Sequence, residues 1–158
     1  MKKIILILTL VSVLVACKSS NSATSTKIDS KSQTAIKGDW NITSVTYPGS
    51  EVIKVTSFDL ADSKCFVGSR WRFISMSNKG NFELNSPNCT AYTTPITWFI
   101  NKEGQFVLKI LDEAKAKSIK TGYVLSVANQ SEKSFQLVDK INVAGKLTDV
   151  VYQFEKIN

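Results

Sequence analysis

From Gly38 onward, apolar and polar residues alternate with a period of two in eight segments of the chain. Successive side chains of a β-strand point to opposite faces, so this alternation predicts strands that each bury one face. The apolar members of the segments are Trp40 and Ile42; Trp71 and Phe73; Phe82 and Leu84; Ile96, Trp98 and Ile100; Phe106, Leu108 and Ile110; Tyr123, Leu125 and Val127; Phe135 and Leu137; and Val150, Tyr152 and Phe154. The alternation predicts an all-β domain.

Short turns join most of these strands. Residues that favour tight turns stand at 78–80, 101–104, 129–132 and 144–145, each between two amphipathic segments. Consecutive strands joined by hairpins form a meander, and a meander of eight strands closes most simply into an up-and-down antiparallel β-barrel. Two connections, at about 47–69 and 86–94, are too long for hairpins and are the places where function would lie; solvated connectors without a function are the alternative.

The N-terminus, residues 1–16, has the layout of a secretory signal peptide, with two lysines, an apolar run at 4–15 and the small Ala16. The run covers about 18 Å as a helix, which is too short to span a bilayer. Residues 14–17 read Leu-Val-Ala-Cys and resemble the lipobox of bacterial lipoproteins. The resemblance implies that Cys17 carries a fatty acid such as palmitate and anchors the protein to a membrane. An ordinary secretory signal, with Cys17 incidental, is the alternative.

Residues 17–37 are rich in Ser, Thr and Lys, with only Ile28 and Ile36 as larger apolar side chains. Such a segment buries too little apolar surface to offset its ordering entropy, so we expect a disordered tether there and a folded domain over 38–158. The formal charge of +7 divides into +2 for the signal, +3 for the tether and +2 for the domain. The basic tether suits anionic headgroups, and the nearly balanced domain argues against nucleic acid as a partner.

Without Cys17, two cysteines remain, one in each long connection. An even number outside the cytoplasm predicts a disulfide, Cys65–Cys89, which would stabilise the fold by about 3 to 4 kcal/mol. Free thiols are the alternative. The chain has no His, and two lone thiols do not make a usual zinc set, so we expect no metal.

The chain lacks the side chains of common catalytic sites. Without His there is no Ser-His-Asp or Cys-His arrangement, and no glycine-rich phosphate loop is present. Carboxylate pairs such as Asp112 with Glu113 stand near lysines, as on a solvated surface. We therefore expect a protein that is not an enzyme and uses no cofactor.

The sequence Gly38-Asp39-Trp40 ahead of eight meandering strands resembles the Gly-x-Trp opening of the lipocalin superfamily. In that family the Trp closes the bottom of the barrel, which implies this role for Gly38 and Trp40. The chain is most similar to short bacterial lipocalin-like lipoproteins over residues 38–156, through the strand at 70–73, the hairpin at 78–82, the two cysteines and the Trp98 strand. The superfamily's Thr-Asp-x-x-Tyr motif is not at its usual place.

Two functions follow from this resemblance. In the first, the barrel carries one small hydrophobic ligand. The candidate interior contacts are Trp71, Phe73, Phe82, Trp98, Phe106, Leu108, Tyr123, Leu125, Phe135 and Tyr152. In the second, these large side chains fill the barrel, and the loop held by Cys65 and Cys89 binds an envelope protein, as an accessory subunit of an outer-membrane complex or as a lysozyme-type inhibitor.

The predicted location is the bacterial cell envelope. Sorting rules of lipoprotein families, applied to the five residues after Cys17, favour the outer membrane and its periplasmic face. Those residues include neither the acidic side chains of surface lipoproteins nor the Asp that retains others at the inner membrane.

Overall fold

The computed structural model describes residues 30–50, 54–111 and 122–157 of the chain. The predicted signal peptide, Cys17 and the first part of the predicted tether lie outside these residues. Within the described ranges, no helix has both the length and the apolar character needed to cross a bilayer.

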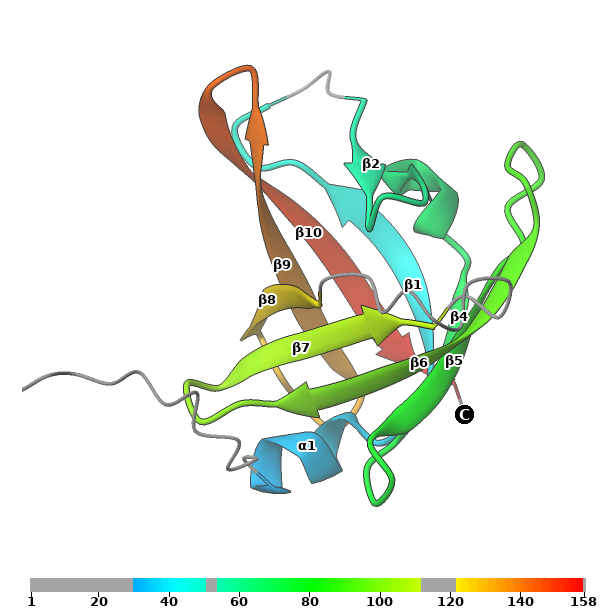
Figure 1. Cartoon of the computed structure of the whole chain (residues 1–158), viewed down its shortest axis with the longest axis vertical. Helices are drawn as coiled ribbons and strands as arrows, with labels where there is room; N and C mark the ends of the chain where they lie inside the picture. Colours follow the sequence, from blue (N-terminus) through cyan, green and yellow to red (C-terminus); the bar gives the residue numbers. More distant parts are fainter. Residues whose placement is uncertain (1–29, 51–53, 112–121, 158) are drawn as a thin grey trace, which may run out of the picture.

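Eight antiparallel strands form a closed barrel (Figure 1). They follow one another around the barrel in chain order, and β1 pairs with both β4 and β10 to close it. The strands are β1 (Gly38–Thr46), β4 (Arg70–Ile74), β5 (Lys79–Leu84), β6 (Tyr92–Ile100), β7 (Gln105–Ile110), β8 (Tyr123–Ala128), β9 (Ser134–Val143) and β10 (Lys146–Lys156). The predicted eight-stranded up-and-down barrel is confirmed.

The long connection between β1 and β4 has structure of its own. It contains a hairpin of two short strands, β2 (Thr56–Ser57) and β3 (Ala61–Asp62), followed by the 3-10 helix η1 (Ser63–Phe66). Figure 1 shows β2 at the end of the barrel opposite the helix α1 (Ser30–Ile36). We call the end at β2 the mouth and the end at α1 the closed end.

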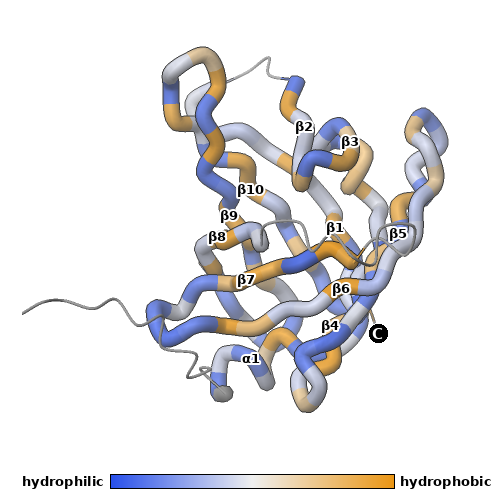
Figure 2. The backbone as a smooth tube through the Cα atoms, viewed as in Figure 1, coloured by the Kyte–Doolittle hydropathy of each residue, from blue (hydrophilic) through white to orange (hydrophobic). Residues whose placement is uncertain are grey.

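The alternation of the sequence appears directly as alternating burial. Along β7, for example, Phe106, Leu108 and Ile110 are buried while the residues between them are partly exposed. Figure 2 shows the matching change between hydrophobic and less hydrophobic residues along the strands. Side chains on the inner face have no route to water, so apolar residues at every second position select this register.

The tight turns also fall where the sequence predicts them. Ala144 and Gly145 join β9 to β10 with φ angles of 50° and 87°, the left-handed conformation that a two-residue hairpin turn requires. Asn78 and Asn129 have φ angles of 55° and 49° in two other turns, where Asn tolerates this conformation better than most residues.

The helix α1 differs from the sequence-based expectation, which placed a disordered tether as far as Lys37. In the structure, residues 30–36 form a helix whose Gln33 and Ile36 are buried, with exposed fractions of 3% and 0%. The folded part therefore begins at least eight residues before Gly38. The sequence does not reveal this helix, because the segment is mostly polar and only two of its described side chains, Gln33 and Ile36, are buried.

Gln33 holds α1 across the closed end. Its Nε2 donates to the Ser75 carbonyl oxygen, at 2.9 Å, and to Asn78 Oδ1, both in the β4–β5 turn. Its Oε1 accepts from the Ile100 backbone N–H at 3.3 Å, at the end of β6. One buried amide thus joins the helix to two separate parts of the barrel rim.

Trp40 and Gly38, the residues predicted to close the barrel, lie beside this helix. The Trp40 indole is fully buried, donates from Nε1 to the Ile36 carbonyl oxygen at 2.7 Å, and meets the Phe135 ring edge-on at 4.7 Å. Gly38 has a φ of +125°, a conformation that L side chains rarely adopt, at the point where the chain passes from helix to strand.

Replacing Gln33 by Ala should lower the free energy of unfolding by about 2 to 3 kcal/mol, because the Ile100 N–H and the Ser75 carbonyl would lose their partner. Urea unfolding followed by tryptophan fluorescence measures this change. Gln130→Ala is the matched control: Gln130 is exposed, donates one bond of 3.3 Å to the Ser32 carbonyl, and should change stability by less than about 0.5 kcal/mol. Equal effects of the two variants would refute the role given to Gln33.

Candidate functional site at the barrel mouth

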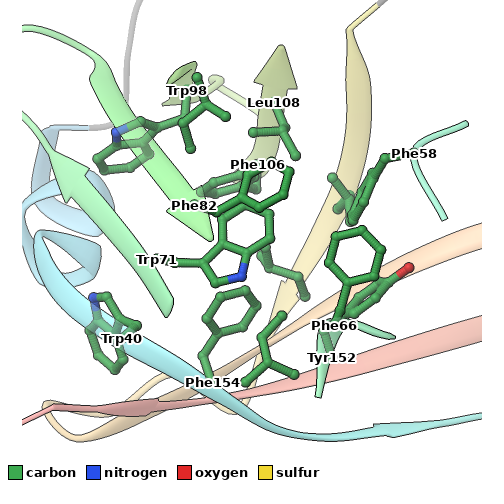
Figure 3. Close-up of a cluster of buried hydrophobic side chains, with 14 of the residues drawn as sticks. Trp40, Phe58, Phe66, Trp71, Phe82, Trp98, Phe106, Leu108, Tyr152 and Phe154 are labelled. Atoms are coloured by element: carbon green, nitrogen blue, oxygen red, sulfur yellow. The ribbon is translucent and has the colours of Figure 1, made fainter. Parts of the chain in front are cut away.

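The structure brings the predicted interior residues together in one core. Nine of the ten candidates have exposed fractions of 2% or less, and only Tyr123 is partly exposed. Figure 3 shows a cluster of buried side chains that includes several of these candidates, with Trp71 near its centre. Their inward placement follows from the alternation, but whether they contact a ligand depends on the space that is left between them.

The closed end of the interior is filled with aromatic rings. Phe73 packs against Trp98, Phe106 and Phe135 at centroid distances of 5.1, 5.6 and 6.4 Å. Trp98 stacks on Phe106 at 5.6 Å, and Phe135 stacks on Phe154 at 4.6 Å. Each such pair contributes about 0.5 to 1.5 kcal/mol beyond the burial of its area, so this half of the barrel is a packed core.

Trp71 divides the closed end from the mouth. Its indole stacks on Phe82 at 4.3 Å and packs against Phe73 at 5.9 Å. Its Nε1 donates to Ser69 Oγ at 2.9 Å, which satisfies the one polar atom of the ring. The other side of Trp71 faces rings that come from the long connection.

Phe58 occupies the mouth, although it belongs to no strand of the barrel. It stands at the tip of the β2–β3 hairpin, is 5% exposed, and contacts four rings, which we call the mouth cage: Phe66, Trp71, Tyr123 and Tyr152. The centroid distances are 5.3, 6.4, 5.1 and 5.4 Å, and the contact with Tyr152 is a stack. A side chain from outside the barrel wall thus fills the space between these four rings.

The hairpin holds Phe58 in a strained conformation. Phe58 and Asp59 have φ angles of 54° and 50°, and the Leu60 N–H donates to the Ser57 carbonyl at 3.0 Å across the turn. This turn type favours Gly, Asn or Asp, and a left-handed conformation costs a residue with a Cβ about 1 to 2 kcal/mol. The hairpin has only two residue pairs, so its closed position depends on what Phe58 and its neighbours contact in the barrel.

Polar groups surround the cage. The buried Ser57 hydroxyl forms a hydrogen bond with the Tyr152 hydroxyl, and Tyr123 Oη donates to Asp59 Oδ2 at 3.1 Å. Burial, reinforced by the bond to Asp59, raises the pKa of Tyr123 to about 12. Burial also raises the pKa of Tyr152. Both phenols are therefore neutral at physiological pH.

Asp139 adds a carboxyl group to the inner face near the cage. It lies two residues beyond the buried Leu137 on β9 and pairs with the buried Val150 of β10. Burial raises the pKa of Asp139, and the ion pairs within the described residues join Arg72 to Asp39 and Lys140 to Asp149 without including it. The mouth thus combines an aromatic cage with hydroxyl and carboxyl groups.

We call the β2–β3 hairpin together with η1, residues 56–66, the lid, and the predicted disulfide is present at its C-terminal end. Cys65 in η1 and Cys89 in the β5–β6 connection are bonded, with their Cα atoms 5.8 Å apart. The bridge fixes η1, and with it Phe66, which packs on Phe82 at 6.0 Å. The β2–β3 hairpin precedes the bridge in the chain and is not itself crosslinked.

Phe58, Phe66, Ser57 and Asp139 were not among the predicted site residues. The first three lie in a connection where side chains follow no period, so the sequence gives no sign of which way they point. Asp139 follows Phe135 and Leu137 at the inward spacing, and this spacing is the signal that could have revealed it.

Residues 36–137 match the family model of the lipocalin-like domain. The chain belongs to the lipocalin-like domain family. The match covers more than half of the chain and includes strands β1 and β4 to β8, the lid and both cysteines of the disulfide. No curated protein matches the chain.

Among solved structures, this lipocalin-like protein is similar to bovine odorant-binding protein. A complex of that protein with a selenium-containing odorant has 11% identity and a TM-score of 0.46, over 80% of this chain and 73% of that chain. A structure of odorant-binding protein from bovine nasal mucosa has 11% identity and a TM-score of 0.44, over 78% and 72% of the two chains.

Proposed function

We propose that this lipocalin-like protein is a non-enzymatic, lipid-anchored protein of the bacterial envelope that binds one small hydrophobic ligand at the barrel mouth. The observation that carries the proposal is the position of Phe58. Its ring enters the mouth from a short hairpin and occupies an aromatic cage that the barrel wall and η1 provide. The ligand replaces Phe58 in this cage when the hairpin moves outward.

The energetics of the hairpin support this exchange. Closing it buries Phe58 but holds two residues at positive φ with only two pairs of backbone partners. A ligand that supplies an equivalent ring to Trp71, Tyr123 and Tyr152 keeps the aromatic contacts and releases the strained turn. The ligand therefore needs to compete only with the net stability of the hairpin.

The chemistry of the mouth indicates the kind of ligand. An aromatic cage favours a flat or branched apolar body, and the hydroxyl groups of Ser57 and Tyr152 with the Asp139 carboxyl favour one polar end. Of the ten residues predicted to contact a ligand, Trp71, Tyr123 and Tyr152 line this site. Phe73, Trp98, Phe106 and Phe135 pack among themselves at the closed end and support the wall.

In a second candidate function, the protein has the same lipid anchor but its barrel mouth stays closed. The packed rings are the observation in its favour, because a barrel without internal space is a rigid support for the disulfide-bonded connection. In that case the connection binds an envelope protein, as an accessory subunit or an enzyme inhibitor. Ligand binding separates the two functions.

Phe58→Ala should bind an apolar fluorescent probe such as N-phenyl-1-naphthylamine at least tenfold more tightly than the wild type, because the cage is already vacant. Probe fluorescence and the quenching of tryptophan emission measure both affinities. The control is Phe135→Ala, which removes a ring of the same size at the closed end, where it is 1% exposed, and should not increase affinity. Equal affinities of the two variants, or no binding by any of the three proteins, would refute the ligand site and favour the second function.

The anchor is tested in cells of a lipoprotein-producing bacterium. The wild type should fractionate with membranes, and mass spectrometry of its N-terminal peptide should show the added mass of fatty acids on Cys17. Cys17→Ala should release the protein into the soluble fraction, because no other residue replaces the acylated cysteine. The double variant Cys65→Ser with Cys89→Ser keeps Cys17 and should remain in the membrane fraction. Membrane retention of Cys17→Ala protein from which the signal peptide has been removed would show that the anchor is wrong.

A further inference from the structure

We propose that the closed end of the barrel rests on an anionic lipid bilayer, so that the mouth points away from the membrane. We call this surface the closed-end face and define it by Ile74, Met76, Lys133, Lys156 and Ile157. The proposal rests on the lipid anchor proposed above, but not on ligand binding.

The face has an apolar projection. Met76 is 99% exposed and Ile74 is 45% exposed, and both lie where β4 turns into β5. Gln33 fixes this turn against α1 through its bond to the Ser75 carbonyl, so the projection is held in place. Figure 1 shows the turn and α1 side by side at the end of the barrel that lies opposite β2. An exposed Met at the tip of a fixed turn can insert among acyl chains near the headgroups.

Basic side chains surround a hollow on the same face. An open groove of about 920 Å³ lies between α1, the β8–β9 turn and the C-terminal residues, and its charged lining residues are Lys31, Glu132, Lys133 and Lys156. Three lysines and one glutamate give the groove a net charge of +2. The Lys156 ammonium lies 5.6 Å from the centre of the Trp40 ring, which holds it at the rim. Such a groove suits anionic headgroups, at about 1 kcal/mol for each basic residue near the surface.

The N-terminal segment that carries the proposed anchor joins the barrel at the closed end, and this favours a membrane as the partner of the closed-end face. Helix α1 begins at Ser30 on this end of the barrel, and Cys17 precedes it by thirteen residues. Thirteen residues span at most about 45 Å, whatever their conformation. An acyl chain at Cys17 therefore holds the start of α1 within about 45 Å of the bilayer, and the charge and the exposed Met76 of this end match that surface.

This orientation assigns a route to the ligand. With the closed end on the membrane, the β2–β3 hairpin opens toward the aqueous side, so the ligand enters from solution or from a partner and not from the bilayer. The same orientation leaves Lys64 and Lys146, which lie at the mouth end, away from the headgroups.

The test uses the Cys17→Ala protein without the predicted signal peptide, residues 1–16, so that neither an acyl group nor the apolar run at 4–15 can bind lipid, and vesicles of phosphatidylcholine with or without 30% phosphatidylglycerol. We expect sedimentation with the anionic vesicles only, and weaker association as salt increases. Adding Lys133→Glu and Lys156→Glu should lower the association constant at least tenfold. The control, Lys64→Glu with Lys146→Glu, changes the net charge equally at the mouth end and should leave the association unchanged.

A second comparison tests the apolar projection. Met76→Ser should weaken association with anionic vesicles, whereas Leu147→Ser, at a residue that is 70% exposed near the mouth, should not. Equal effects of the two lysine pairs, or no association of the Cys17→Ala protein, would overturn the proposed face. Acylation and membrane retention of the wild type in cells would be unaffected by that result, so the anchor and the face fail separately.

Discussion

A closed barrel of eight strands encloses a space that is just wide enough for the inward side chains of its own strands. Every second residue of each strand must enter that space, and in this protein many of the entering residues are aromatic. Trp71, stacked on Phe82 at 4.3 Å and packed against Phe73 at 5.9 Å, joins the rings of the closed end to those of the mouth. The shape of the interior depends on this packing.

The strands alone leave both ends of the barrel open, and segments outside the wall cover them differently. At the closed end, α1 is held by buried hydrogen bonds from Gln33 and Trp40. At the mouth, a two-pair hairpin contributes one ring, Phe58, at positive φ, and only the following η1 is fixed by the disulfide. The first cover rests on buried hydrogen bonds, whereas the second holds Phe58 and Asp59 at positive φ, and for this reason we propose that the mouth is the end that opens.

The sequence predicts the barrel because side-chain period is a local property. All eight alternating segments became strands, and the two cysteines in the long connections became the disulfide. The parts that could not be predicted depend on contacts between distant segments. In the sequence, Gln33 is one more polar residue of a predicted tether, and only the folded barrel brings Ser75 and Ile100 within hydrogen-bond distance of it. Phe58 is likewise a residue of a long connection, and only the fold places four aromatic rings around it. Nine of the ten predicted contact residues are buried inside the barrel and Tyr123 is partly exposed, but the alternation alone does not distinguish residues of the packed wall from residues of a binding site.

The central claim is that Phe58 stands in for a ligand at the mouth. A crystal structure of the protein with a bound apolar probe tests it most directly. The account predicts the probe between Trp71, Tyr123 and Tyr152, with Phe58 and the β2–β3 hairpin displaced and the rings of Phe73, Trp98 and Phe135 unmoved. A probe bound elsewhere, with Phe58 still in the cage, would contradict it.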